Sequence, residues 1–172
     1  SGANNHKIII SKISSQAFLE NGTLVLTLPS ITGSADNLPI SLSASSASID
    51  LKTFTLDVKE GQFKISEQVM QFAGRVLDLQ TIQDLKITAR NLEIPQITKI
   101  LKSFAIYLPN TISGTTDISL NISTEADKGL RIRGKSKFRK FNCPELKLQF
   151  AELEIAELDY LRRTDSTSVT KA

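Results

Sequence analysis

The sequence contains no tryptophan, one methionine, one cysteine and one histidine among its 172 residues. Cys143 has no second cysteine with which to form an intramolecular disulfide, which excludes a disulfide-stabilised scaffold. His6 lies close to the start of the chain, so we expect neither a histidine-based metal site nor a Ser-His or Cys-His catalytic pair in the body of the protein. The eight glycines are scattered, without a phosphate-binding cluster. The sequence therefore indicates a protein that is not an enzyme and that has no cofactor or metal.

Strong net charge and long apolar runs are also lacking. A formal charge of +3 from 21 basic and 18 acidic residues is too small to indicate nucleic-acid binding, which usually gives a strongly basic domain. No stretch reaches the roughly 18 to 20 consecutive apolar residues of a membrane span, and no signal-peptide pattern is present. We expect no nucleic-acid partner, and contact with a membrane only through segments outside this chain.

What the sequence does contain is alternation of apolar and polar residues with a period of two, which is typical of β-strands with one apolar face. In Asp117 to Ser123, isoleucine or leucine stands at every second position. Similar runs recur every 8 to 12 residues, which predicts nine or ten strands. Turns are expected at Asn21-Gly22, at Glu60-Gly61 and over residues 125–129, and a strand that includes Leu146 is expected after Pro144.

One segment has a helical period instead. Residues 95–108 begin and end near Pro95 and Pro109, and their apolar positions are three or four residues apart. This spacing predicts a short amphipathic helix that packs either on the end of the sheet or at the mouth of a groove. Its apolar face consists of Ile97, Ile100, Leu101 and Phe104.

Five basic residues alternate along one predicted strand face: Arg131, Arg133, Lys135, Lys137 and Arg139. This basic stripe has three interpretations. It is either an ordinary solvated outer face, which we favour, or a surface for anionic lipid headgroups. Nucleic-acid binding through the stripe is the third and least favoured, because the basic residues are not regularly interleaved with aromatic residues that could stack on bases.

The residues around the predicted helix resemble a known family. The sequence runs from Leu85 to Leu92 as a strand, continues as Leu92-Glu93-Ile94-Pro95 into the helix, and then reads Tyr107-Leu108-Pro109 and Ile112-Ser113-Gly114 before the next long strand. This order resembles the AsmA-like envelope proteins, relatives of TamB, over about 40 residues. The remainder of the chain is similar to them only in its alternation.

The resemblance implies an all-β, mainly antiparallel fold with a long, strongly curved sheet that forms a groove. It also implies transfer of phospholipid between membranes, support of outer-membrane homeostasis, and a periplasmic location in a Gram-negative envelope with a membrane anchor. The chain is much shorter than most members and has no anchor, so we expect it to be a piece of a longer protein. We expect residues 6–161 to form one domain, residues 1–5 to be a remnant of cloning or a disordered start, and residues 162–172 to be a polar, disordered tail.

A sheet with one aliphatic face has to cover that face with a second sheet, by curling, or with acyl chains. The closed alternative is a β-sandwich module, of the adhesin type, without a ligand. In the open case the ligand is phospholipid or another molecule with an acyl chain, and neighbouring chains make end-to-end sheet contacts. The residues expected to face the ligand are Leu85, Ile87, Ile118, Leu120, Ile122, Leu130, Ile132, Leu146, Leu148 and Phe150.

Overall fold

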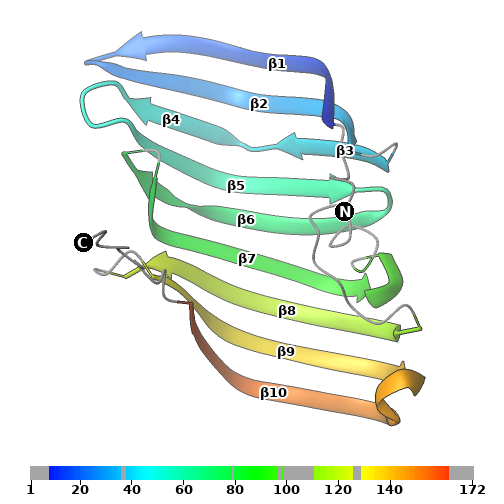
Figure 1. Ribbon diagram of the computed structural model, residues 1–172. Helices are drawn as coiled ribbons and strands as arrows, with labels where there is room; N and C mark the ends of the chain where they lie inside the picture. Colours follow the sequence, from blue (N-terminus) through cyan, green and yellow to red (C-terminus); the bar gives the residue numbers. More distant parts are fainter. Residues whose placement is uncertain are drawn as a thin grey trace, which may run out of the picture.

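The computed structural model describes residues 8–35, 38–78, 80–96, 98, 111–125 and 129–162, and almost all of them belong to β-strands (Figure 1). The strands β1 to β5 are Ile8–Glu20, Thr23–Ala35, Leu38–Ser43, Ser46–Asp50 and Thr55–Ile65. The strands β6 to β10 are Gln68–Leu77, Thr81–Glu93, Ser113–Thr124, Leu130–Cys143 and Leu148–Arg162. A 3-10 turn, η1, covers Pro144–Leu146. The all-β prediction is confirmed.

All the strands belong to one antiparallel sheet, and each strand pairs with the next one in the chain except that β3 and β4 do not pair with each other. β3 and β4 share one position between β2 and β5, so the sheet has nine strand positions. With a spacing of roughly 4.8 Å between neighbouring strands, the sheet is about 38 Å wide. The described strands form no second layer that covers this sheet, in contrast to the two layers that a closed sandwich requires.

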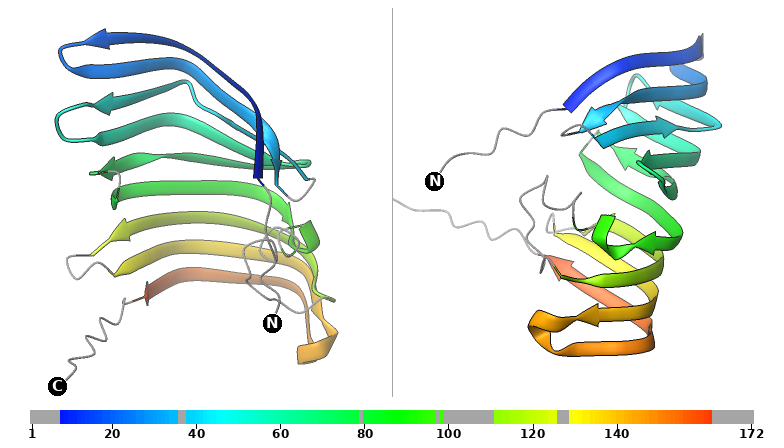
Figure 2. Two further views of the ribbon diagram at one scale, coloured as in Figure 1. Left: turned by 45° about the horizontal axis from the view of Figure 1, so that its top comes forward. Right: turned by 90° about the vertical axis from the view of Figure 1, so that its right-hand side faces the viewer.

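The sheet is strongly curved, as the turned views show (Figure 2). Irregular positions occur at the same level in several strands of one half of the sheet. β-bulges bend the strands that contain them. β1 shifts between Ser14 and Gln16, and β5 shifts between Val58 and Gly61. Between these two strands, Leu28 of β2 has a positive φ of 48° and Ala44 and Ser45 interrupt β3 and β4. We attribute the bend in this half of the sheet to this line of irregular positions.

Two local predictions are wrong. Glu60-Gly61 does not form a turn, because β5 runs through it and Glu60 is a bulge residue with φ of 48°. A bulge and a tight turn favour the same residue types, and only the pairing with β6 distinguishes them. Leu146 does not belong to a strand either, because η1 contains it and β10 begins at Leu148.

Other local predictions are confirmed. Asn21 and Gly22 form the β1–β2 turn with φ values of 48° and 80°, which is the left-handed conformation that a two-residue hairpin turn requires. At the predicted turn after β8, the Glu125 N–H donates to the carbonyl oxygen of Gly129 over 2.8 Å.

The predicted helix is described only at its start. Residues 94–96 and Thr98 are helical, one residue earlier than expected, and the Thr98 hydroxyl donates to the Ile94 carbonyl oxygen over 2.9 Å. Both of these side chains are buried. The predicted apolar helix face, Ile97, Ile100, Leu101 and Phe104, lies outside the described residues.

The sheet extends from Ile8 to Arg162, so Arg162, where we expected the tail to begin, is the last residue of β10. The cloning remnant or disordered start expected at residues 1–5, and the rest of the expected tail, lie outside the described residues.

Candidate functional site

Apolar side chains form continuous rows across the strands on one face of the sheet. Residues that lie directly opposite each other on neighbouring strands point to the same face. The first row crosses all nine strand positions, and serine replaces an apolar side chain at one position only. It consists of Ile13, Ile31, Leu42, Phe63, Met70, Ala89, Ile118, Ser136 and Ile155.

A second row on the same face also crosses the whole sheet. It consists of Ala17, Leu26, Ala47, Val58, Gly74, Leu85, Ile122, Ile132 and Tyr160. Between the two rows, a shorter middle row crosses six strands. It consists of Gly61, Phe72, Ile87, Leu120, Gly134 and Leu158.

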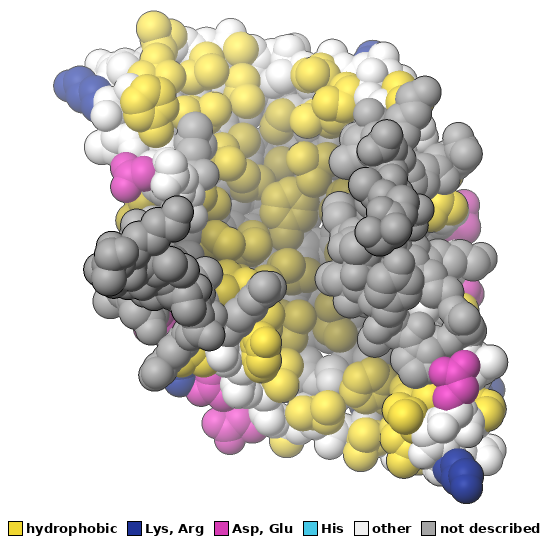
Figure 3. Space-filling model, viewed as in Figure 1, with side chains coloured by type: hydrophobic (Ala, Val, Ile, Leu, Met, Phe, Trp, Pro, Cys, Tyr) yellow, Lys and Arg dark blue, Asp and Glu magenta, His cyan; other side chains and the backbone are white. Residues whose placement is uncertain are grey.

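These rows follow the hollow of the curved sheet. In the space-filling view, hydrophobic side chains gather along a hollow that runs across the strands, and the visible charged side chains lie toward its margins (Figure 3). We call this apolar concave face, made of the three rows, the trough.

Most trough side chains are half-buried or exposed, although Ala47 and Ala89 are buried. Ile13 is 69% exposed and Tyr160 is 51% exposed. Apolar side chains buried among the described residues are few: Ala47, Ile65, Ala89, Leu92, Ile94 and Cys143. A contiguous exposed apolar surface usually marks a binding site in a monomeric protein.

The opposite face of the sheet is polar. At each strand position from β1 to β9, a residue adjacent to the first row lies on this face. These residues form a continuous polar row. It consists of Ser14, Ser30, Ser43, Gln62, Gln71, Thr88, Ser119 and Lys135. The two faces therefore differ sharply in solvation, as the alternation predicts.

The predicted basic stripe lies on this polar face, and acidic residues of neighbouring strands neutralise most of it. Arg131 forms an ion pair with Asp159 at 2.5 Å, and a Lys137–Glu152 pair also has a distance of 2.5 Å. Arg133 contacts Asp159 as well, at 3.5 Å. Arg139 pairs with an aspartate of β8. Among the described residues, Lys135 alone of the five has no such pair, which favours the interpretation as a solvated outer face.

The best-connected of these pairs joins three strands. An oxygen of Asp117 on β8 lies 2.6 Å from Nη2 of Arg139 on β9, and the other oxygen accepts a 2.8 Å hydrogen bond from the backbone N–H of Asn91 on β7. These two donors, the guanidinium first, lower the pKa of Asp117 to about 2. Asn91 has φ of 52° and lies at the register shift between Ala89 and Leu92. The carboxylate thus stabilises the bulge in β7.

Six of the ten predicted ligand-facing residues belong to the three rows. Leu85, Ile122 and Ile132 belong to the second row, Ile118 to the first, and Ile87 and Leu120 to the middle row. Leu130 is opposite Thr124, at the end of the strands. Leu146 lies outside the rows in η1 and is 59% exposed.

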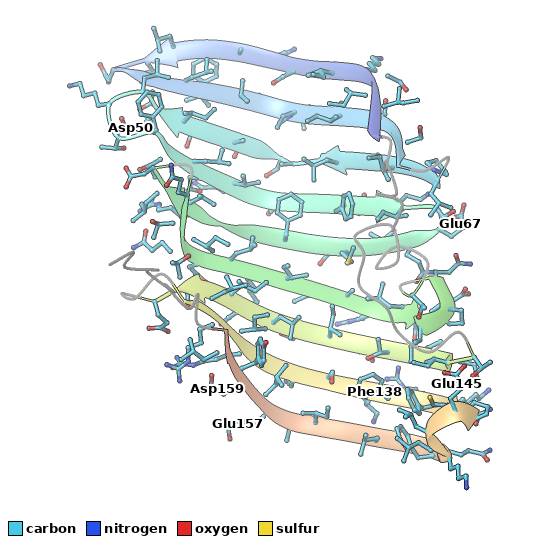
Figure 4. All side chains as sticks on the ribbon, viewed as in Figure 1. Asp50, Glu67, Phe138, Glu145, Glu157 and Asp159 are labelled. Atoms are coloured by element: carbon cyan, nitrogen blue, oxygen red, sulfur yellow. The ribbon has the colours of Figure 1, made fainter. Side chains whose placement is uncertain are left out.

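The other two predicted residues, Leu148 and Phe150, begin β10. Leu148 is opposite the buried Cys143, and Phe150 stacks on Phe141 with ring centroids 4.6 Å apart. Phe141 also meets Phe138 edge to face at 6.0 Å. Phe138 is labelled in Figure 4, on β9, whereas the labelled Asp50 ends β4, Glu67 lies in the turn between β5 and β6, and Glu145 lies in η1.

The residues predicted from the sequence omit the first half of the trough. The rows across β1 to β6 include the large side chains of Ile13, Ile31, Leu42, Phe63 and Phe72. The signal for them was present, because the same alternation runs through that half of the chain. The bulges concealed it, because each one changes which residues of a strand share a face.

A shallow hollow of about 780 Å³ also lies on the polar face, between Gln71, Thr88, Ser119 and Lys135. Its charged walls contain both signs, since Arg90 and Lys137 occur with Asp117 and Glu154. Because Asp117 and Lys137 already have ion-pair partners, this hollow lacks a defined set of free ligating groups.

Within the described ranges, no group of three or more His, Cys, Asp or Glu residues is arranged to hold a metal ion. None of the described helical segments has the length and apolarity that crossing a bilayer requires. No family model, curated protein or solved structure matches the chain. The geometry of the trough is therefore the main basis for a functional assignment.

Proposed function

We propose that the trough binds the acyl chains of phospholipid, and that the protein is a non-catalytic, AsmA-like domain that helps to move phospholipid between the membranes of a Gram-negative envelope and so supports outer-membrane homeostasis. The observation that carries this proposal is the pair of apolar rows that cross all nine strand positions. The periplasmic location, and anchoring to a membrane through segments outside this chain, are part of the same proposal.

The dimensions of the trough suit hydrocarbon chains. Its length of about 38 Å exceeds twice the depth of one leaflet's hydrocarbon, roughly 15 Å. Burial of a methylene group contributes roughly 0.8 kcal/mol, so a 16-carbon chain that buries half of its surface gains about 6 kcal/mol without any specific polar contact. A continuous aliphatic wall is sufficient for this kind of binding.

The polar face is consistent with this role because it keeps the other side of the sheet in water. Its ion pairs neutralise most of the basic stripe, so we assign the ligand to the trough and not to the stripe. The resemblance of residues 85–123 to AsmA-like proteins supports the same function. A ligand-free sandwich module is the less favoured alternative, because the described strands form a single layer.

The direct test is native mass spectrometry of the chain after incubation with vesicles of phosphatidylethanolamine and phosphatidylglycerol in a 3:1 ratio. We expect at least one phospholipid to remain bound to each folded chain. A folded chain that carries no phospholipid under these conditions would rule out the proposed function.

A further inference from the structure

Gly61 occupies a position in the trough at which the backbone does not require glycine. It lies in β5, next to the bulge residue Glu60, and is absent from the glycines with positive φ, which are Gly22, Gly114 and Gly134. Any residue type could adopt its backbone conformation. The reason for glycine at this position is therefore spatial.

The space in question is filled by Phe72. The two residues are direct cross-strand partners on β5 and β6. A Cβ atom added to Gly61 would lie 2.6 Å from Cε2 and 2.7 Å from Cε1 of Phe72, and Cζ would be in contact as well. The outer edge of the ring thus occupies the volume that a side chain at residue 61 would need.

This pair lies at the middle of the trough. β6 is the fifth of the nine strand positions, and Phe72 and Gly61 belong to the middle row. Ile87 is opposite Phe72 on the other side, so the ring has a neighbour on β7 as well. If a larger residue replaced Gly61, the ring could move most easily away from the sheet, which is into the hollow.

From this arrangement we infer that the hydrocarbon of the ligand crosses the middle of the trough over the Phe72 ring, and that Gly61 keeps this crossing open. This inference rests on the proposed function and specifies it further. Each half of the trough is about 19 Å long, slightly less than the roughly 20 to 22 Å of a whole phospholipid in one leaflet. An unobstructed centre therefore lets a lipid lie across both halves.

The first experiment uses the absence of tryptophan from the sequence. Phe72→Trp introduces a single tryptophan at the centre of the trough, and Gln71→Trp places one at the preceding residue of the same strand, on the polar face. Vesicles of phosphatidylcholine with brominated acyl chains should quench the first tryptophan several-fold more than the second. Equal quenching of the two, in variants that mass spectrometry shows to carry lipid, overturns the inference.

The second experiment narrows the crossing with Gly61→Val. Binding of headgroup-labelled phosphatidylethanolamine is measured for chains of 12, 14 and 16 carbons. In the native protein the affinity should rise by up to roughly fourfold for each additional buried methylene. In Gly61→Val the increase with chain length should be lost, and the affinity for the 16-carbon lipid should fall at least tenfold.

Two further variants separate obstruction from misfolding. Phe72→Ala removes the ring, so Gly61→Val in that background should fold with a native circular dichroism spectrum and regain the dependence on chain length. An unchanged dependence in a folded Gly61→Val single variant overturns the inference but leaves the proposed function intact. A native protein that binds none of the lipids overturns the proposed function, and the inference with it.

Discussion

Asp117 and Arg139 form a charge-assisted hydrogen bond of 2.6 Å between β8 and β9, and the same carboxylate accepts the backbone N–H of Asn91 on β7. One side chain therefore links three strands at the point where β7 bulges. The pair lies on the polar face, so it contributes to the curvature of the sheet without touching the trough.

This contact predicts a dependence of stability on pH. The pKa of Asp117 is about 2 in the folded protein, below the ordinary value of 3.8, so its contribution is complete above about pH 4 and is lost as the pH falls to 2. We expect an NMR titration of the Asp117 carboxyl to give a pKa near 2. Asp117→Asn should cost about 1 kcal/mol at pH 7 and less at pH 2. A measured pKa at or above 3.8 would contradict this prediction.

A charge in the trough should abolish lipid capture, whereas the same charge on the adjacent residue should not. Leu120 lies in the middle row, and Asn121 follows it on the polar face of the same strand, between Lys86 and Arg133. We expect Leu120→Glu to lose phospholipid in native mass spectrometry, because burial of hydrocarbon against a carboxylate is unfavourable. Asn121→Glu should retain it. If both variants keep the lipid, or both lose it while folded, the trough is not the binding face.

The aromatic cluster of β9 and β10 should make a measurable contribution to stability. Phe141 contacts Phe150 face to face and Phe138 edge to face. Its replacement by alanine removes both contacts, and we expect the free energy of unfolding to fall by about 2 kcal/mol, measured with urea. Phe18→Ala is the matched control, because Phe18 is 50% exposed on β1. This substitution should lower the free energy of unfolding by less than about 0.5 kcal/mol. Equal costs would show that the cluster adds nothing.

The two edges of the sheet should differ in their tendency to associate. β1 contains only Lys12 and Glu20 as charged residues, whereas β10 contains several acidic ones. Unprotected apolar edges pair with other strands. We therefore expect concentration-dependent association through β1 in sedimentation velocity experiments, with a decrease for Ile9→Lys, which adds charge at an exposed position. Gln149→Lys on β10 is the control and should have no such effect. A native chain that is monomeric at all concentrations would contradict the prediction of end-to-end contacts.

Much of the local structure could be predicted because it depends on nearby residues. The alternation from Asp117 to Ser123 predicted β8, and Asn21-Gly22 predicted the first hairpin. The prediction of a turn at Glu60-Gly61 was wrong because a bulge and a turn share the same residue preferences. The pairing of Gly61 with Phe72, eleven residues away, could not be deduced from either residue alone, since it depends on the register between two strands.

The sequence by itself determined that this protein would be built from strands with one aliphatic and one polar face, because side chains alternate across a strand whatever its surroundings. It also set the positions of the basic residues on β9. Only the tertiary structure decided that the aliphatic faces of the described strands share one concave side and that acidic neighbours pair with most of the basic stripe. The physical reason is that a period of two is the same in a closed sandwich and in an open curved sheet. Register, bulges and cross-strand partners distinguish the two, and these arise only when strands distant in the sequence meet.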